Sequence, residues 1–323
     1  MNDTPAAPAC ADTTAAAIAK AIVRLRSAGR VSPSDRDDAL ALARSGLQAG
    51  LAGQAIPLLA ALQTHCPADT SVTLLHGVAL RQQQRLGEAA AVFAAARSAG
   101  CADPLLLQGL AQTRYELGLP AAALFGDALQ VLPDDAELAR NHATALAAEG
   151  EPLKAESLLE AHLVAQPDWL DGHKALATLR WTRGDQSRFA ESYAIAVQAR
   201  PSNSDLWLAW FRALAQTRAW DAARAVLDQA ERAIGQSAAL MVSRLFVASE
   251  AGDLAEAERL LAVTASFEGE TVALCRVRHH LRQGRPREAE AEALRYLLTP
   301  SATLFWPYLS LAWRLAGDSR HVW

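Results

Sequence analysis

Small and apolar residues recur along the chain at helical spacing, in blocks that repeat about every 34 residues. Proline ends four of these blocks, at Pro67, Pro133, Pro167 and Pro201. A column of small residues recurs at steps of 34 or 32 residues, or of twice 34 where Phe189 interrupts, at Ala55, Ala89, Ala121, Ala155, Ala223, Ala257 and Ala289. Four residues after each small residue, most blocks have a large apolar side chain, as at Phe93, Phe125 and Leu159. This period predicts helical hairpins, in which a small residue lies at the helix crossing and proline ends the second helix.

The repeat predicts an all-α chain of stacked hairpins. A glycine lies five residues before the small column in several blocks, at Gly150, Gly184, Gly252 and Gly284, where the chain turns between two helices. One hairpin cannot bury its own apolar face, so neighbouring hairpins must supply the core. We expect about eight hairpins over residues 36–303, at 36–69, 70–103, 104–135, 136–169, 170–203, 204–237, 238–269 and 270–303.

The segments that flank the repeats have different patterns. We expect a disordered tail over 1–12, then a capping helix and linker over 13–35, with Thr13 or Thr14 as the N-cap. An amphipathic membrane anchor is the alternative for this helix, but it needs a larger basic face than three cations provide. Residues 304–323 are predicted to form the first helix of a further repeat, or the junction to another domain.

Composition excludes several classes of function. The chain is 51% hydrophobic and 20% charged with a formal net charge of −4, which gives no basic excess to hold nucleic acid. The sequence contains no run of about 18 apolar residues, so it predicts no membrane span. The four cysteines are far apart in the sequence and lack metal-ligand spacing, which favours a reduced cytoplasm. About 70 alanines, together with few lysines, are typical of a GC-rich bacterial genome.

The repeat columns resemble those of the tetratricopeptide repeat (TPR) family. One unit matches through Trp207, Trp210, Leu214, Ala223, Leu227 and Ala230, and another through Gly77, Ala89, Phe93 and Ala96. Departures are Phe189 in the small column, the missing proline after Ala230, and a degenerate seventh and eighth unit. The resemblance implies a right-handed superhelical α-solenoid and a non-catalytic module for protein–protein interaction.

No set of residues indicates catalysis or metal binding. The sequence lacks a Gly-rich phosphate loop, a G-x-S-x-G elbow, an H-E-x-x-H helix and an H-x-D pair. His279 and His280 are the nearest to a metal pair, but adjacent helical residues point about 100° apart. We therefore predict no catalytic residue, no metal and no cofactor in this chain.

The resemblance also implies a peptide-binding groove lined by the first helices of the units. The corresponding residues are Arg81, Gln82, Arg114, Arg140, Asn141, Thr144, Lys174, Thr178, Trp181, Arg212, Arg278 and Arg282. These arginines and amides could bind a carboxylate or a peptide backbone, and Trp181 could form an aromatic floor. Asp171 and Asp205 could neutralise part of the charge. The alternative is that these residues are only the solvated sides of amphipathic helices.

Two further hypotheses concern the end of the chain. Residues 304–323 resemble the junction between a TPR array and a putative 2-oxoglutarate/Fe(II)-dependent oxygenase domain in bacterial proteins. The resemblance implies that such a domain, with Fe(II) and 2-oxoglutarate as cofactors, would begin after Trp323, and that this chain would recruit its substrate. Alternatively, the half-unit between Trp306 and Trp313 could mediate self-association as an assembly scaffold.

Overall fold

Helices are the regular elements throughout the described part of the chain. The structure is a computed structural model; it describes residues 8–317, and their side chains from residue 12 onward. Over this range it contains 18 α-helices and no strand. The chain divides into two compact units, Met1–Ala165 and Gln166–Trp323, which are described separately. The prediction of an all-α fold of stacked helical hairpins is confirmed.

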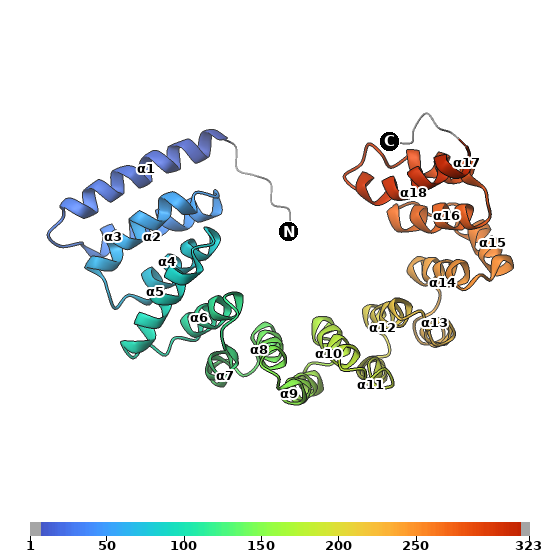
Figure 1. The fold of residues 1–323 in the computed structure, drawn as a ribbon, viewed down its shortest axis with the longest axis horizontal. Coiled ribbons are helices and arrows are strands. Elements are labelled where there is room, and N and C mark those ends of the chain that lie inside the picture. The colour runs from blue at the N-terminus through green and yellow to red at the C-terminus, as the bar shows by residue number, and fades with distance from the viewer. Residues whose placement is uncertain (1–7, 318–323) are drawn as a thin grey trace. The chain divides into compact units, whose positions relative to one another are not determined.

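The first unit contains one leading helix and four hairpins. Its helices are α1 (Pro8–Ser27), α2 (Pro33–Gln48), α3 (Ala52–His65), α4 (Thr70–Gln82), α5 (Leu86–Ser98), α6 (Pro104–Glu116), α7 (Ala122–Val131), α8 (Ala136–Ala148) and α9 (Pro152–Ala165). Each helix packs against the next one along the chain from α2 to α9. The first helices α4, α6 and α8 also pack against one another, so they form one layer of the unit (Figure 1).

The second unit contains four hairpins and one final helix. Its helices are α10 (Leu170–Thr182), α11 (Glu191–Ala199), α12 (Ser204–Gln216), α13 (Trp220–Ile234), α14 (Ala238–Ala251), α15 (Leu254–Val263), α16 (Glu270–Arg282), α17 (Pro286–Leu294) and α18 (Ala302–Leu315). The first helices pack in pairs, α10 against α12, α14 against α16 and α16 against α18. Figure 1 shows α11 and α13 in a second layer, below and to the right of α10 and α12.

The two flanks differ from the predicted boundaries. Helix α1 begins at Pro8, so the expected helix start at 13 is wrong, and Thr13 and Thr14 lie inside the helix rather than at its N-cap. Residues 1–7 of the expected tail lie outside the described residues. At the other end α18 begins at Ala302, and residues 318–323 of the expected junction lie outside the described residues. The oxygenase domain expected beyond them stays a prediction.

Short polar residues fix the starts of the first helices. Asp69, Asp103 and Asp135 are the N-caps of α4, α6 and α8, and each carboxylate accepts hydrogen bonds from backbone N–H groups of its helix. Asn203 and Ser237 cap α12 and α14 in the same way. These side chains satisfy N–H groups that have no partner within the helix. They mark the starts of these five helices, whereas the first helices α10 and α16 begin without a side-chain cap.

Aromatic side chains fill the space between consecutive hairpins. Phe93 on α5 is buried between Gly77 of α4 and Gly109 of α6, both of which have no side chain in its way. A Cβ atom at Gly77 would lie 2.1 Å from the Phe93 ring, so a larger residue does not fit there. In the second unit, Trp207 and Phe211 of α12 occupy the core with Tyr193 of α11. Members of both sequence columns, such as Ala89 and Phe93, are buried in the core.

Helix α1 packs against the first hairpin. Ile18 and Leu25 are buried, and the Ile18 side chain lies over Gly46 of α2. The His65 ring nitrogen Nε2 lies 3.0 Å from the Leu25 carbonyl oxygen, so it donates a hydrogen bond that ties α3 to α1. Helix α1 thereby covers an apolar face of α2 and α3, as a terminal cap of a repeat array must do.

None of the helices within residues 8–317 combines the length and the apolar character needed to cross a membrane.

Candidate binding site

The first helices of the second unit line a cavity of about 480 Å³ between α10, α11 and α12, which we call the first cavity. Asp171, Lys174, Thr178 and Trp181 of α10 all line it. They are three or four residues apart, which places them on one face of the helix. Three of these four, Lys174, Thr178 and Trp181, belong to the predicted groove set.

Helix α12 forms the facing wall of the first cavity. Arg212 and Gln216 line the cavity from successive turns, and Ala209 and Ala213 of the same helix also line it. The short alanine side chains leave room that larger residues would fill. Arg212, the fourth predicted residue in this cavity, is exposed to solvent.

Aromatic rings form the floor of the first cavity. Trp181 packs edge-on against Phe189, with ring centroids 5.6 Å apart. Tyr193 packs against His173 at 5.1 Å, and burial, followed by the nearby Asp171 charge, raises the pKa of Tyr193 to about 12. The tyrosine hydroxyl therefore stays protonated near neutral pH.

Two cations at the first cavity have no carboxylate partner. Among the described residues, neither Lys174 nor Arg212 forms a salt bridge or a side-chain hydrogen bond. Asp171 also lines the cavity but pairs with neither of them within residues 8–317. The cavity therefore presents two unpaired positive charges beside aromatic and apolar surface, an arrangement suited to an anionic group.

The predicted arginines of α4 and α6 are engaged within the first unit. Arg81 forms a salt bridge of 2.6 Å with Glu116, and it lines a separate polar cavity of about 570 Å³ with Gln82. Arg114 donates from its Nε to the Pro120 carbonyl oxygen at 2.8 Å. These contacts join a first helix to its neighbour or to the following turn. The charges of Arg81 and Arg114 are therefore largely used within the fold.

The predicted residues of α8 lie on its solvent-facing side. Arg140 is 3.8 Å from Glu137, one turn earlier, and both side chains are exposed. The Thr144 hydroxyl donates to the Arg140 carbonyl oxygen at 2.9 Å, whereas Asn141 is half-buried. Among the cavities described here, none is lined by these three residues.

The predicted arginines of α16 converge on one carboxylate. Arg278 and Arg282 each form a salt bridge of 2.5 Å with Glu250 of α14. Arg278 also lies over the Phe246 ring at 5.3 Å, and Arg282 donates to the Ser249 carbonyl oxygen. These guanidinium groups hold α14 and α16 together. Their interactions are internal to the second unit, unlike those expected of residues presented to a ligand.

A second cavity of about 630 Å³ adjoins the first one and lies between α12, α14 and α16. Arg212 and Gln216 of α12 line both cavities. The remaining walls are mainly apolar and include Phe211, Val242, Phe246 and Cys275. Burial raises the pKa of the Cys275 thiol to about 11, so the thiol is neutral near pH 7 and behaves as a small apolar group.

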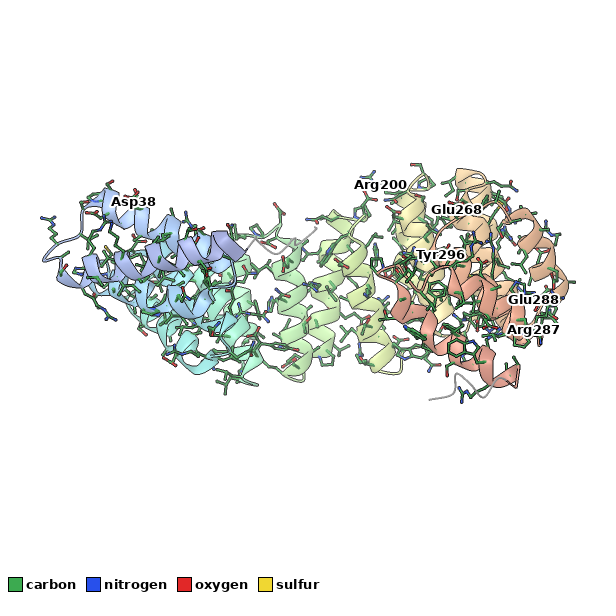
Figure 2. The ribbon with its side chains drawn as sticks, turned by 90° about the horizontal axis from the view of Figure 1, so that it is seen from above. Asp38, Arg200, Glu268, Arg287, Glu288 and Tyr296 are labelled. Atoms are coloured by element: carbon green, nitrogen blue, oxygen red, sulfur yellow. The ribbon has the colours of Figure 1, made fainter. Side chains whose placement is uncertain are left out.

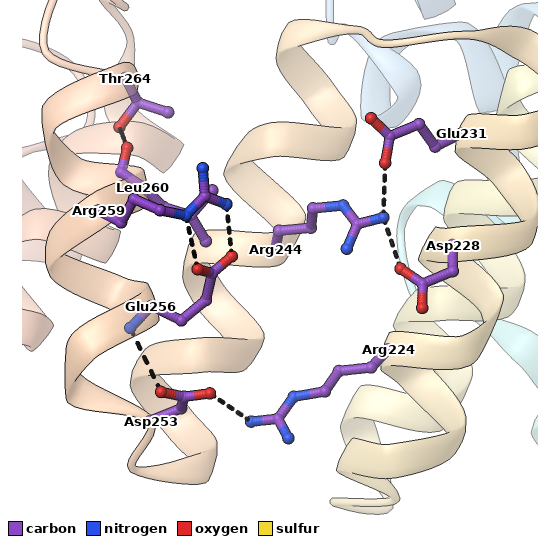
Figure 3. Close-up of polar contacts among 9 residues, drawn as sticks. All are labelled: Arg224, Asp228, Glu231, Arg244, Asp253, Glu256, Arg259, Leu260 and Thr264. Atoms are coloured by element: carbon purple, nitrogen blue, oxygen red, sulfur yellow. Dashed lines mark hydrogen bonds and ion pairs between the residues drawn. The ribbon is translucent and has the colours of Figure 1, made fainter.

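Ion pairs fix the position of α14, which forms one wall of the second cavity. Figure 3 shows Arg244 of α14 between Asp228 and Glu231 of α13, at 2.6 and 2.7 Å. In the same view, Arg224 of α13 reaches Asp253 at the start of α15, at 3.8 Å. These contacts attach α14 and α15 to α13.

Sequence reasoning missed most residues of the second cavity. Val242 and Phe246 belong to the first helix of the degenerate seventh unit, whereas the repeat columns of that unit are matched only later, at Gly252 and Ala257. At the position of the missing proline after Ala230, Gly235 ends α13 instead. Phe189, the departure in the small column, was a signal for the first cavity.

The two histidines singled out in the sequence, His279 and His280, are adjacent on α16. His279 is fully buried and its Nε2 lies 3.4 Å from Glu258, whereas burial lowers the pKa of the neighbouring His280. Across residues 8–317, no group of three or more His, Cys, Asp or Glu side chains is placed to hold a metal ion.

Comparison with known proteins gives similarities of structure alone. No model of a known protein family matches the chain, and no curated protein does. A solved tetratricopeptide repeat protein from Parabacteroides merdae ATCC 43184 has 15% identity and a TM-score of 0.46, covering 86% of this chain and 98% of that one. YrrB, described as a TPR protein with an unusual peptide-binding site, has 18% identity and a TM-score of 0.46, with 63% and 99% covered.

A thermophilic TPR protein of Thermus thermophilus, TTC0263, has 21% identity and a TM-score of 0.40, covering 55% of this chain and 98% of that one. These identities and TM-scores are low, so the fold class rests on the helices described above. The helices define each unit as an α-solenoid of helical hairpins with cavities between its first helices.

Proposed function

We propose that this chain is a non-catalytic protein-interaction module, and that its second unit binds a peptide segment of a partner protein along the first helices α10 and α12. The segment contains an acidic residue, whose carboxylate binds between Lys174 and Arg212 in the first cavity. The observation that supports the proposal most directly is that these two cations line a cavity and lack a carboxylate partner among the described residues.

The surroundings of the two cations favour a peptide over a free ion. The cavity also presents Thr178 and Gln216, whose hydroxyl and amide groups can pair with a peptide backbone. Trp181 is 43% exposed, so its ring offers apolar surface to a side chain or to the backbone itself. A free ion would leave this surface unused.

A pool of 12-residue peptides tests the proposal, with one central position fixed as Asp or as Lys and the other positions random. We expect the purified chain to retain the Asp pool and not the Lys pool. For a single peptide from the retained pool, Arg212→Glu should weaken binding by roughly tenfold to a hundredfold in fluorescence anisotropy, because a charge-assisted bond becomes a repulsion.

Arg287→Glu is the matched control, because it makes the same change in net charge at an exposed residue of α17 that lines neither cavity (Figure 2). We expect it to change the affinity by about twofold or less at 0.15 M salt. Equal retention of the Asp and Lys pools, or equal losses in the two variants, would contradict the proposal.

A further inference from the structure

The second cavity has the composition of a receptor for an apolar side chain. Phe211, Val242, Val272 and Cys275 are all less than one-tenth exposed, and they form its inner surface. Its lining also includes the polar residues Ser243, Glu268 and Thr271, besides Arg212 and Gln216. An apolar surface with a few polar groups is typical of sites that take an apolar group and orient it.

The second cavity adjoins the first one on α12, which points to a shared ligand. Arg212 and Gln216 line both cavities, so a peptide carboxylate at Arg212 lies at the boundary between them. A neighbouring residue of the same peptide then reaches the second cavity without crossing another helix. Glu268, on the connection between α15 and α16 (Figure 2), disfavours a second carboxylate there.

We propose that the second cavity binds a bulky apolar side chain, such as Leu, Ile, Met or Phe, of the same peptide whose acidic residue binds at Lys174 and Arg212. This inference rests on the proposed function and makes it more specific. The ligand is then a segment with an acidic residue and a nearby large apolar residue, and the second cavity sets the specificity.

The walls of the second cavity are held in place without a ligand. The Arg244 pairs fix α14 to α13, and Glu250 ties α14 to Arg278 and Arg282 of α16. Arg278 covers the Phe246 ring, which lines the cavity. A cavity with anchored walls loses little conformational freedom when an apolar group fills it, which favours binding.

The test fills the cavity while leaving the cations intact. Ala239 lies in the first turn of α14, is exposed, and lines the second cavity, so Ala239→Phe puts a ring of this chain where the ligand side chain would bind. Ala262→Phe is the matched control, since Ala262 of α15 is exposed and lines neither cavity. Both variants keep Lys174 and Arg212.

The probe is the peptide pool with Asp fixed at the central position. With the unaltered chain we expect Leu, Ile, Met or Phe to be enriched about fivefold or more at one position near the Asp. Replacing that residue with Ala in one peptide should weaken binding about tenfold. In Ala239→Phe the apolar enrichment should vanish while the preference for Asp over Lys remains; Ala262→Phe should match the unaltered chain.

The outcomes separate this inference from the proposed function. Retention of the Asp pool without any apolar enrichment would overturn the inference alone, and so would apolar enrichment that persists in Ala239→Phe. Failure to prefer Asp over Lys would overturn the proposed function and the inference with it. Retained Asp preference in Ala239→Phe also shows that the variant folds.

Discussion

At the scale of single residues, the environment of a side chain decides whether it is available to a ligand. The sequence shows seven basic residues at groove positions, and they are chemically similar. Arg81, Arg278 and Arg282 are paired with carboxylates within their units. Lys174 and Arg212 have no carboxylate partner among the described residues. A paired arginine must break its own salt bridge before it binds another anion, so the unpaired residues are better sites.

Cys275 provides a test of the second cavity at the residue scale. The thiolate is the reactive form, and burial holds the thiol neutral with a pKa of about 11. Iodoacetamide should therefore alkylate Cys275 more slowly than the partly exposed Cys101. The alkylation rate at Cys275 should rise about tenfold per pH unit between pH 7 and 10. Peptide mass spectrometry of each site measures this. A rate at Cys275 that levels off near pH 8.5 would show an unburied thiol.

At the scale of elements, hairpins contribute to one another's helix ends. Helix α7 begins at Ala122 after Pro120 and Ala121, a stretch with no side chain that can act as an N-cap. Glu149, the residue after α8, supplies the cap instead. Its Oε1 accepts hydrogen bonds from the N–H groups of Ala121 and Ala122 at 2.6 and 2.7 Å. The α6–α7 and α8–α9 hairpins are thus joined by a carboxylate at a helix N-terminus.

Glu149→Ala should lower the free energy of unfolding by about 1–2 kcal/mol, because it leaves two backbone donors without their acceptor. Urea denaturation followed by circular dichroism measures the change. Glu149→Gln keeps an acceptor oxygen and should lose less. Glu151→Ala removes only an exposed pair with Lys154 and should cost below about 0.5 kcal/mol. Equal losses in the two alanine variants would refute the capping role.

At the scale of the whole molecule, stacked hairpins make stability local. The chain forms two compact units, and within each unit a hairpin packs against its neighbours in the sequence. In such an array, stability is approximately a sum over units and their shared faces. Damage at one crossing should therefore spread to the adjacent hairpins and no further.

Gly77→Ala tests this locality, because the new Cβ would meet the buried Phe93 ring at 2.1 Å. We expect a loss of about 1–3 kcal/mol from overpacking. Hydrogen exchange should accelerate in α4, α5 and α6 and stay unchanged in α14 and α16. Gly87→Ala, with open space around it, should cause no loss. Faster exchange throughout both units would contradict the local coupling.

The sequence also predicted parts of the candidate site. Lys174, Thr178, Trp181 and Arg212 were expected in the groove, and all four line the first cavity. The spacing along α10 suffices for this, because a helix places residues three or four apart on one face. Spacing does not reveal which side chains of other helices contact that face. Arg278 and Arg282 therefore belong to the same predicted set, although both form salt bridges with Glu250.

The sequence by itself determined the helices and their pairing. Alanine-rich segments favour helix, and the 34-residue columns place a large apolar residue four positions after a small one in most units, since both properties are local or repeat along the chain. The tertiary structure alone decided which cations remain unpaired, and it formed the second cavity between α12, α14 and α16. Both depend on distances between side chains of different helices, and no periodic pattern in one sequence specifies those distances.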